Sequence, residues 1–280
     1  MKSIKLAAVV VLYNPSDDNI KNINKYIDEV NNLYVIDNSE DDTIRIKETK
    51  KIKYIKYYDN KGIATALNDA AKTAIDNNYE WLLTLDQDSE ITSKIIKDMK
   101  RFLLDSKIDR IGLISPYHDI DTIDEIPEEK YTDIIEIMTS GNIINLAAYQ
   151  EIGGFKDWLF IDNVDTEYCM NLHRHKYKVL RLNKIIMKHH LGDYKVHHFL
   201  GKDYRVSNHS AIRRYYMVRN SLYINDMYKD IYNEYCSFLI RIQKGQAKRV
   251  LLFERDKLKK LLMMYRGYRD YKNKKKGKYQ

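Results

Sequence analysis

Two aspartates lie two residues apart in the segment Leu85-Asp86-Gln87-Asp88, directly after a short apolar run. In an extended chain, side chains at positions i and i+2 point to the same side, so both carboxylates can converge on one point. Carboxylate oxygens are the ligands that Mg²⁺ and Mn²⁺ prefer, and such an ion in turn binds diphosphate oxygens. The pair indicates a metal-assisted diphosphate site, although a single Asp-x-Asp pair is also common in solvated turns.

Two other apolar runs also end in polar residues, at Tyr13-Asn14-Pro15 and at Asp37-Asn38-Ser39. If these runs are parallel strands, their carboxyl ends meet at one edge of the sheet, which is where α/β folds bind ligands. We therefore expect Tyr13, Asp37 and Asp86 to line a single crevice. Taken alone, the Asp37 segment also fits a helix cap or a turn.

A further candidate, Asn60-Lys61-Gly62, precedes an alanine-rich helical pattern. Backbone N–H groups at the start of a helix can bind phosphate, so Asn60 and Gly62 are candidates for contacts with a phosphorylated ligand. The same residues are explained equally well as the entry turn of the helix.

Strands and helices are expected to alternate along most of the chain. Short β-branched apolar runs predict strands, and apolar residues spaced by three and four predict helices. Strands are predicted at 6–13, 33–37, 52–58, 81–86, 111–115, 134–145 and 179–182, and helices at 17–30, 62–75, 91–104 and 164–176. We expect a loop at the acid-rich stretch 117–131 and mainly helix after Ser210. This order predicts an α/β fold with parallel strands.

The positive charge of the chain is concentrated at its end. The 280 residues include 48 Lys and Arg against 40 Asp and Glu, a net charge of +8, but residues 241–280 hold 15 of these bases and only three of the acids. The remaining residues carry 33 bases and 37 acids, a net charge of −4. A nucleic-acid-binding module would need basic residues on its folded body, so this distribution argues against one.

The composition also bears on the compartment. No apolar run reaches the length of about 18 residues that a bilayer-spanning helix needs. Cys169 and Cys236 are the only two cysteines, which is too few for a disulfide scaffold and indicates a reducing compartment. We expect a cytoplasmic protein, either soluble or peripheral on the cytoplasmic face of the plasma membrane.

Five blocks of the sequence together resemble the glycosyltransferases of family 2, which are inverting enzymes with a GT-A fold. They occur in the family's order between residues 4 and 220, and five blocks in order are far more specific than any single one. The blocks are Val9-Val-Val-Leu-Tyr13-Asn-Pro15, Ile36-Asp37-Asn-Ser39, Asn60-Lys-Gly-Ile-Ala-Thr-Ala-Leu-Asn68, Leu85-Asp-Gln-Asp88 and Gly153-Gly-Phe-Lys-Asp-Trp-Leu-Phe-Ile-Asp-Asn-Val-Asp165-Thr-Glu-Tyr-Cys169. Leu85 to Ser89, Thr139 to Asn142 and Val164 to Cys169 look most like bacterial rhamnosyltransferases.

The resemblance implies a domain organisation. Residues 1–220 would form the GT-A catalytic domain, with a Rossmann-like nucleotide-binding half and a mixed central sheet. Residues 221–280 would form a helical, basic, amphipathic extension. The resemblance also places Asn60 and Gly62 in the donor site.

The resemblance further implies how a nucleotide-sugar donor would be held. Tyr13 and Asp37 would hold the nucleoside base, and Asp86 the ribose or sugar side. Asp88 would bind a Mg²⁺ or Mn²⁺ ion that bridges the diphosphate. His190, in a histidine-rich stretch, would complete the metal site, although a loop histidine that bonds to backbone is an equally good interpretation.

For the transfer step, the resemblance implies that Asp165 is the catalytic base. Glu167, two residues on, stays open as the alternative, because Val164 replaces the Glu that is usual in the family. Trp158 and Glu167 would lie on the acceptor or sugar side. Arg219 could clamp donor phosphate, although an arginine on a helix is more often solvated.

The implied function is the transfer of a sugar, rhamnose from dTDP-rhamnose, to a glycan or lipid-linked glycan in cell-surface polysaccharide synthesis. The alternative is a family 2 enzyme that uses a UDP-sugar, either galactofuranose or an N-acetylhexosamine. Two lower alternatives are a sugar nucleotidyltransferase and a non-catalytic membrane-surface binding protein.

The end of the chain has its own pattern. From Val250 onward apolar residues recur at spacings of seven, three and four, and basic residues fill the intervening positions; they are Leu251, Leu258, Leu261, Leu262, Tyr265 and Tyr268. This pattern predicts a basic amphipathic helix. Such a helix can lie on an anionic bilayer, or it can pack its apolar side on the catalytic domain.

Overall fold

A computed structural model describes residues 4–41, 46–119, 126–188, 195–199 and 201–280. The chain divides into two compact units. The first, called here the sheet unit, comprises Met1–Asp157 and Asp165–His190. The second, called the helical unit, comprises Trp158–Val164 and Leu191–Gln280.

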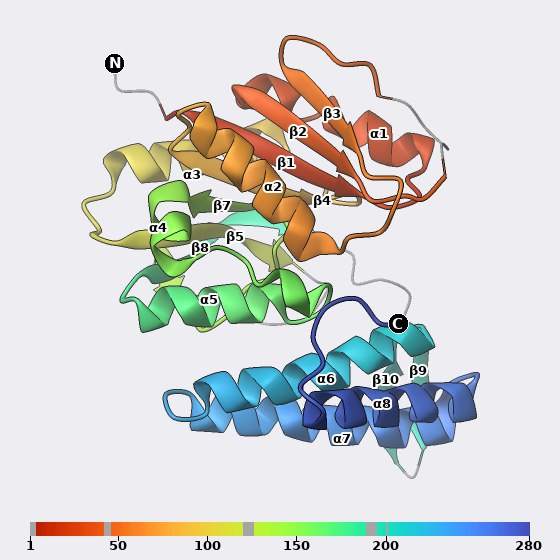
Figure 1. Cartoon of the computed structure of the whole chain (residues 1–280). Helices are drawn as coiled ribbons and strands as arrows, with labels where there is room; N and C mark the ends of the chain where they lie inside the picture. Colours follow the sequence, from red (N-terminus) through yellow and green to blue (C-terminus); the bar gives the residue numbers. More distant parts are fainter. Residues whose placement is uncertain (1–3, 42–45, 120–125, 189–194, 200) are drawn as a thin grey trace. The chain divides into compact units, whose positions relative to one another are not determined.

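The sheet unit is built around one mixed sheet of eight strands (Figure 1). Their order is β3-β2-β1-β4-β7-β5-β8-β6. The strands are β1 (Leu6–Leu12), β2 (Asn32–Asp37), β3 (Ile52–Lys56), β4 (Trp81–Asp86), β5 (Ile111–Asp119), β6 (Tyr131–Asp133), β7 (Asn142–Asn145) and β8 (Lys178–Lys188). The first four are parallel to one another, and β7 runs antiparallel to both β4 and β5.

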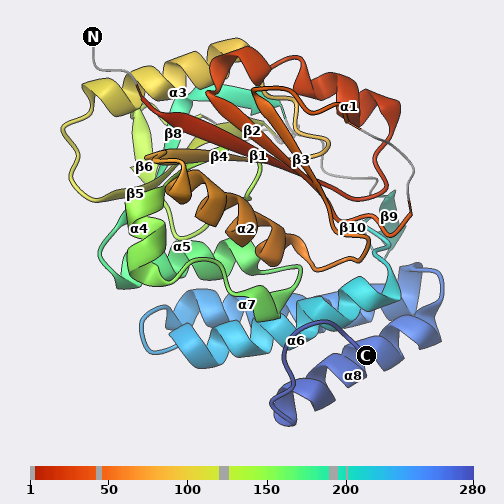
Figure 2. The same cartoon turned by 45° about the horizontal axis from the view of Figure 1, so that its top comes forward.

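Helices cover both faces of this sheet, with α1 and α3 on one side and α2, α4 and α5 on the other (Figure 2). Their bounds are α1 (Asp17–Ile23), α2 (Ile63–Asp76), α3 (Ser93–Asp105), α4 (Leu146–Ile152) and α5 (Val164–Arg174), with short 3-10 turns at Ile27–Glu29 and Asp157–Leu159. Because side chains alternate along a strand, Leu6 and Val10 of β1 enter the core cluster that contains Ile96 of α3. The alanine-rich α2 packs on the opposite face.

The register of the parallel strands brings their polar ends together. Leu12 pairs with Asp37 on the neighbouring β2, and Val11 pairs with Asp86 on β4. The carboxyl ends of β1, β2 and β4 therefore lie side by side at one edge of the sheet, which confirms the predicted arrangement of these three strands.

The helical unit consists of a β-hairpin and three helices. The hairpin pairs β9 (Lys195–Phe199) with β10 (Lys202–Val206), and the helices are α6 (Ala211–Tyr228), α7 (Asn233–Phe253) and α8 (Lys257–Lys272). Helices α6 and α8 approach so closely that a Cβ atom on Gly267 would lie 2.5 Å from the carbonyl oxygen of Tyr215. This position therefore requires glycine.

A buried ion network joins the three helices of this unit. Arg214 of α6 pairs with Glu254, which directly follows α7, and Glu254 Oε2 also accepts from Lys260 Nζ of α8 at 2.9 Å. All three side chains are almost fully buried. Burying charge is costly unless it is paired, so this network specifies how the three helices pack.

The structure differs from the sequence predictions in several places. The predicted division after residue 220 stays a prediction, and residue 220 lies within α6. The predicted strand 134–145 is reduced to β7, the predicted helix 17–30 ends at Ile23, and the hairpin β9–β10 was not predicted. The single amphipathic helix expected after Val250 is divided between α7 and α8, because the chain turns at Asp256, which has a left-handed backbone conformation. None of the helices in the described ranges is long and apolar enough to cross a bilayer.

Candidate active site

The three strand ends are bound to one another by side chains at their carboxyl edge. Gln87, between the two aspartates, accepts a hydrogen bond from the Tyr13 backbone N–H at 2.8 Å. Ser39 Oγ accepts from the Asn14 backbone N–H at 2.7 Å. The carboxyl edge, defined here as residues 12–14, 37–39 and 86–89, is therefore one connected surface.

Asp37 lies at the base of this edge and is 1% exposed. Its carboxylate accepts four hydrogen bonds, two from the backbone and hydroxyl of Ser39, one from Tyr54 OH at 2.7 Å and one from Lys56 Nζ at 3.0 Å. Burial works against ionisation, but these hydrogen bonds together hold the pKa of Asp37 below its usual value. Asp37 is thus a charged carboxylate that fixes the end of β2 to β3.

The two aspartates after β4 have different surroundings. The Asp86 backbone N–H donates to Ser89 Oγ at 2.9 Å, which shapes the turn after the strand, and the Asp86 side chain is half-buried. The Asp88 side chain is exposed. Asp88 is therefore available to a ligand.

A divalent ion fits this pair by donor chemistry, since carboxylate oxygens suit Mg²⁺ and Mn²⁺. Among the described residues, no three His, Cys, Asp or Glu side chains gather where they could hold one ion. His190, the predicted third ligand, lies outside the described residues. The remaining coordination positions would then fall to the diphosphate of a bound ligand and to water.

Asn60 and Gly62 form the entry turn of α2. Gly62 has φ +86°, which favours glycine, and its backbone N–H donates to Asn60 Oδ1 at 3.0 Å. The N–H group that could have been offered to phosphate is therefore bound within the turn. The geometry corresponds to the helix-entry interpretation of this segment.

Asn68, six residues after Gly62, has a role that the sequence did not reveal. Its side chain is buried and bonds to both the backbone N–H and the carbonyl of Phe155, at 3.0 and 2.8 Å, and it accepts from Tyr149 OH at 2.7 Å. It also donates to Asp157. Helix α2 thereby holds the Gly153–Asp157 segment in place.

Asp165 lies in the first turn of α5 and is half-buried. One of its carboxylate oxygens, Oδ1, accepts from the Thr166 backbone N–H at 2.9 Å, and the side chain lines a small cavity together with Phe155 and Cys169. Glu167, by contrast, is 0% exposed. Of these two carboxylates, only that of Asp165 is partly exposed.

Glu136 is a third carboxylate of this region, and the sequence analysis did not single it out. It is exposed and accepts from Thr166 Oγ1 at 2.7 Å. Burial raises the pKa of the Cys169 thiol, and the nearby carboxylates of Asp165, Glu136 and Glu167 raise it further. The start of α5 is thus an acidic region with a thiol that stays protonated.

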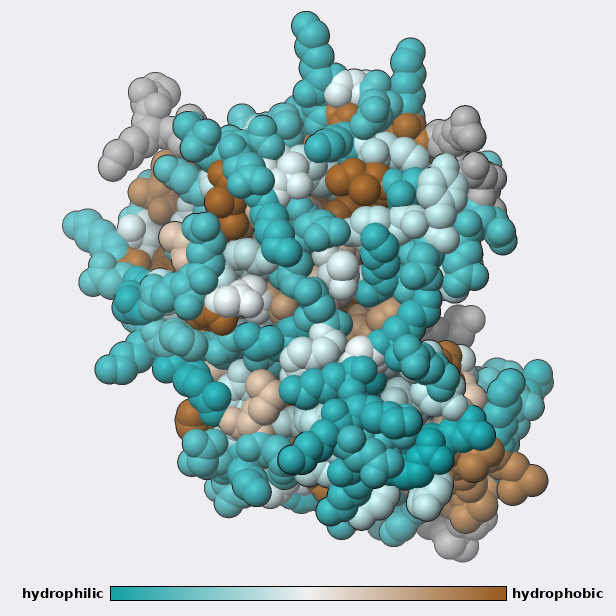
Figure 3. Space-filling view, in the orientation of Figure 1, coloured by the Kyte–Doolittle hydropathy of each residue, from teal (hydrophilic) through white to brown (hydrophobic). Residues whose placement is uncertain are grey.

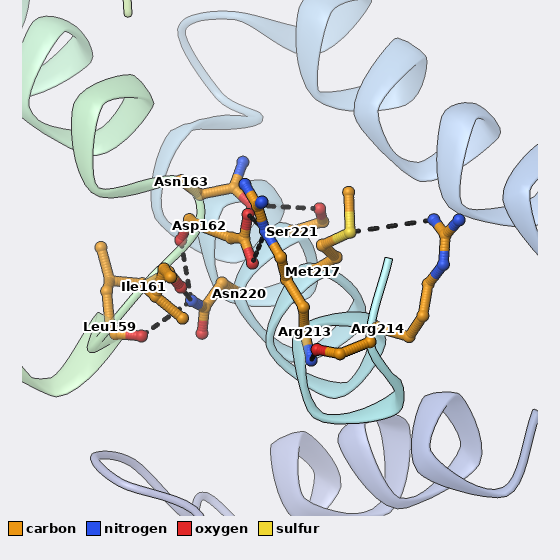
Figure 4. A network of polar contacts seen from close by, with 10 residues as sticks. Leu159, Ile161, Asp162, Asn163, Arg213, Arg214, Met217, Asn220 and Ser221 are labelled. Atoms are coloured by element: carbon orange, nitrogen blue, oxygen red, sulfur yellow. Dashed lines mark hydrogen bonds and ion pairs between the residues drawn. The ribbon is translucent and has the colours of Figure 1, made fainter. Parts of the chain in front are cut away.

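The segment that precedes Asp165 belongs to the helical unit and is held by α6 (Figure 4). The buried Asn220 amide donates to the carbonyls of Leu159, Ile161 and Asp162 at 2.8 to 2.9 Å. Arg213 Nε donates to Asp162 Oδ1 at 3.1 Å. We call residues 158–164 the held loop.

The backbone of the held loop is strained. Phe160, Asp162 and Asn163 all have φ between +61° and +68°, a left-handed region that residues with side chains rarely adopt. Such conformations persist where the surrounding structure imposes them, and they cluster at functional sites. The hydrogen bonds from Asn220 supply this constraint.

Arg219, predicted to clamp donor phosphate, has a different set of partners. It is 1% exposed, and its guanidinium donates to the carbonyls of Trp158, Leu159 and Gly277 at 3.0, 3.2 and 2.6 Å. A buried guanidinium with three carbonyl partners is not free to reach a phosphate. We therefore correct the prediction and interpret Arg219 as a residue that holds the loop.

Trp158, at the start of the held loop, lies beside a hollow in the helical unit. Its ring packs edge-on against Tyr223, with the ring centres 5.1 Å apart, and Lys276 Nζ lies 4.4 Å from its ring centre. The hollow is lined by Tyr223, Tyr271 and Lys276, among others. Aromatic rings with neighbouring cations suit a sugar or an anionic group, so this surrounding is compatible with an acceptor-side role.

Comparisons with known proteins agree on one family. The family profile described as glycosyl transferase family 2 matches residues 9–156. The alignment with the dTDP-rhamnosyl transferase RfbF of Shigella flexneri is 241 residues long at 30% identity, and the match covers 76% of this chain and 77% of RfbF.

Two solved structures show the fold relationship. The S. aureus TarS 1–349 structure in complex with UDP-GlcNAc has a TM-score of 0.60 at 14% identity and covers 96% of this chain and 80% of that chain. GalNAc-T7 with UDP, GalNAc and Mn²⁺ has a TM-score of 0.56 at 12% identity and covers 98% of this chain and 58% of that chain. At these identities the likeness concerns the fold alone.

Proposed function

The chain belongs to glycosyl transferase family 2 and has its GT-A fold, and from this premise we propose that it transfers rhamnose from dTDP-rhamnose to a glycan acceptor with inversion. The observation that carries the donor assignment is the likeness to a dTDP-rhamnosyl transferase over three quarters of both chains. Family membership also argues against the two lower alternatives, a sugar nucleotidyltransferase and a non-catalytic binding protein.

In the proposed reaction, an acceptor hydroxyl attacks the anomeric carbon while the nucleoside diphosphate leaves from the opposite face. The hydroxyl proton must go to a base, and we assign it to the Asp165 carboxylate, because Asp165 is partly exposed whereas Glu167 is fully buried. A positioned general base contributes about a hundred- to ten-thousandfold in rate. Thr166, whose N–H donates to Asp165, fixes the orientation of this carboxylate.

The donor would bind along the carboxyl edge. The Tyr13 ring is 47% exposed and would lie against the nucleoside base, while Asp37 holds the end of β2 beneath it and Asp86 faces the ribose or sugar side. Asp88 would hold a Mg²⁺ or Mn²⁺ ion together with the donor diphosphate. When bound, such an ion offsets the negative charge that grows on the leaving group.

The acceptor is proposed to be a glycan or lipid-linked glycan of cell-surface polysaccharide synthesis, with the enzyme at the cytoplasmic face of the membrane. This proposal is supported by the likeness to RfbF and by exposed apolar and basic residues of the helical unit. Trp158 would then contact the acceptor, because it lies in the held loop and its ring packs against Tyr223, which lines the hollow.

A donor panel tests the proposal. We expect release of dTDP from dTDP-rhamnose, stimulated by Mn²⁺ or Mg²⁺ and abolished by a chelator. UDP-galactofuranose and UDP-N-acetylhexosamines test the alternative, which the UDP-GlcNAc complex of a protein with the same fold makes reasonable. Turnover of UDP-sugars alone would overturn the rhamnosyl assignment and leave the family assignment intact.

A further inference from the structure

One end of the helical unit exposes several leucines together. Leu251 and Leu252 at the end of α7 are 57% and 47% exposed, and Leu258 and Leu262 at the start of α8 are 85% and 50% exposed. The two helices are joined by the short turn 254–256, so only residues 253–257 separate Leu252 from Leu258 in sequence. We call these four residues the leucine corner. Figure 3 shows a brown patch at the lower right, where Figure 1, in the same orientation, has the turn between α7 and α8.

These leucines are not needed by the core of the unit. Helix α8 already buries Met263, Met264 and Gly267 on another face, and Lys260 completes the buried ion network with Glu254. An amphipathic helix normally leaves polar residues on the side opposite its buried face. Here that side presents leucines to solvent, and exposed apolar patches of this kind mark interaction sites.

The charges around the leucine corner are almost all positive. Lys248, Arg255, Lys257 and Lys259 are exposed, and Asp256 is the exposed acid among them. The other acid of this stretch, Glu254, is buried and already neutralised by Arg214 and Lys260. Leucines surrounded by lysine and arginine match the interface of an anionic bilayer, where acyl chains lie beneath negative headgroups.

From this complementarity we propose that the leucine corner docks the enzyme on an anionic lipid bilayer. The leucines enter the headgroup region, and the surrounding cations bind the lipid phosphates. Membrane binding itself needs neither donor nor acceptor. The proposal rests on the proposed function only for its purpose, which is to bring the enzyme to a lipid-linked acceptor.

Leu251, Leu258 and Leu262 of this corner belong to the amphipathic pattern that the sequence analysis found after Val250, and the structure adds where they lie in the fold. The terminal segment, residues 266–280, is packed onto the helical unit. The Gly277 N–H donates to the Trp158 carbonyl at 2.9 Å, and the Gly277 carbonyl accepts from Arg219. The Tyr279 N–H donates to Tyr216 OH at 2.8 Å. The end of the chain therefore supports the fold of this unit, and the leucine corner is left as the membrane-facing surface.

The first test is sedimentation of the full chain with phosphatidylcholine vesicles, with and without phosphatidylglycerol. We expect binding only to the anionic vesicles and weaker binding at high salt. The double variant Leu258→Asp with Leu262→Asp should lower the affinity at least about tenfold, and so should Lys257→Glu with Lys259→Glu. Both pairs are exposed, so folding should be preserved, which the thermal melting curve checks.

The matched control is Leu104→Asp, which changes an exposed leucine on α3 of the sheet unit, 47% exposed, and should bind vesicles as the wild type does. The proposal would be overturned if the wild-type protein does not bind anionic vesicles. It would also be overturned if the double variant Leu258→Asp with Leu262→Asp binds them as tightly as the wild type does. Donor turnover with a soluble acceptor should be equal in wild type and variant. A failed donor panel with intact vesicle binding would refute the proposed function and leave the docking surface standing.

Discussion

The carboxyl edge of the sheet unit and the held loop of the helical unit are each fixed by different physical means. At the carboxyl edge, parallel strands set the positions, and short contacts such as Gln87 to Tyr13 only complete them. In the held loop, the backbone is left-handed at three positions, and side chains of α6 about sixty residues later in the chain hold it there. The geometry of the carboxyl edge therefore depends on the sheet itself, whereas the geometry of the held loop depends on α6.

This comparison predicts that removing a reacting group has the largest effect. Asp165→Asn should lower the transfer rate by about a hundred- to ten-thousandfold and leave donor binding intact, because the amide keeps the shape but cannot take the proton. Rate and donor affinity are measured separately, by dTDP release and by calorimetry. If turnover stays at the wild-type level while Glu167→Gln abolishes it, the base is Glu167.

A change at the carboxyl edge should mainly affect metal use. Asp88→Asn is expected to weaken Mn²⁺ activation by about 10- to 100-fold, because a carboxylate ligand is lost. The fold should not change, since the Asp88 side chain is exposed. The control is Glu90→Gln, an exposed acid two residues away, which should titrate with Mn²⁺ as the wild type does. Equal metal dependence in both variants would contradict the assignment.

A change in α6 should affect both stability and the acceptor. Asn220→Ala removes the side-chain donor of the Ile161 and Asp162 carbonyls and leaves the Leu159 carbonyl with Arg219 alone, which we expect to cost about 2 kcal/mol of unfolding free energy. The KM for acceptor should rise more than the KM for donor, because the held loop lies on the proposed acceptor side. Asn225→Ala, a half-buried position on the same helix, serves as the control. A pure stability loss with unchanged acceptor KM would show that the loop does not position the acceptor.

The smallest effect is expected from the ion pair beneath the carboxyl edge. Lys56→Met removes one of four donors to Asp37 and should cost about 1 kcal/mol at neutral pH. The pKa of Asp37 in the folded protein is held below the 3.8 of a free aspartate. The stability contributed by the Asp37 carboxylate is therefore complete above pH 3.8 and is lost as the pH falls through the pKa of the folded state. The stability gap between wild type and variant should therefore close in acid. Urea unfolding from pH 3 to pH 7 measures it, and a gap that does not change with pH would refute this role.

Local patterns predicted the carboxyl edge because they report local geometry. Apolar and β-branched runs located β1, β2 and β4, and with β4 the position of Asp86 at its end, whereas Asp88 lies in the turn after the strand, where the i, i+2 rule for extended chain does not apply. For Asn60 and Gly62 the sequence left two interpretations open; the structure shows their turn at the start of α2, and their contact with a donor stays a prediction.

The residues that sequence reasoning missed all act over long separations. Asn68 binds Phe155, and Asn220 binds Leu159, and in neither case does spacing connect the partners. Arg219 was misassigned for the same reason, since a helical arginine gives no local sign that three backbone carbonyls will surround it. A buried amide and a buried guanidinium become recognisable only when their partners are in place.

The sequence by itself determined the α/β architecture, the family and the acidic strand end, because hydrophobic period and strand polarity are properties of neighbouring residues. Only the tertiary structure decided that Asp165 is accessible and Glu167 is not, that α6 imposes the conformation of residues 158–164, and that the leucines after Val250 face solvent. Burial and hydrogen-bond satisfaction are set by segments far apart in the chain, so they exist only once those segments have packed.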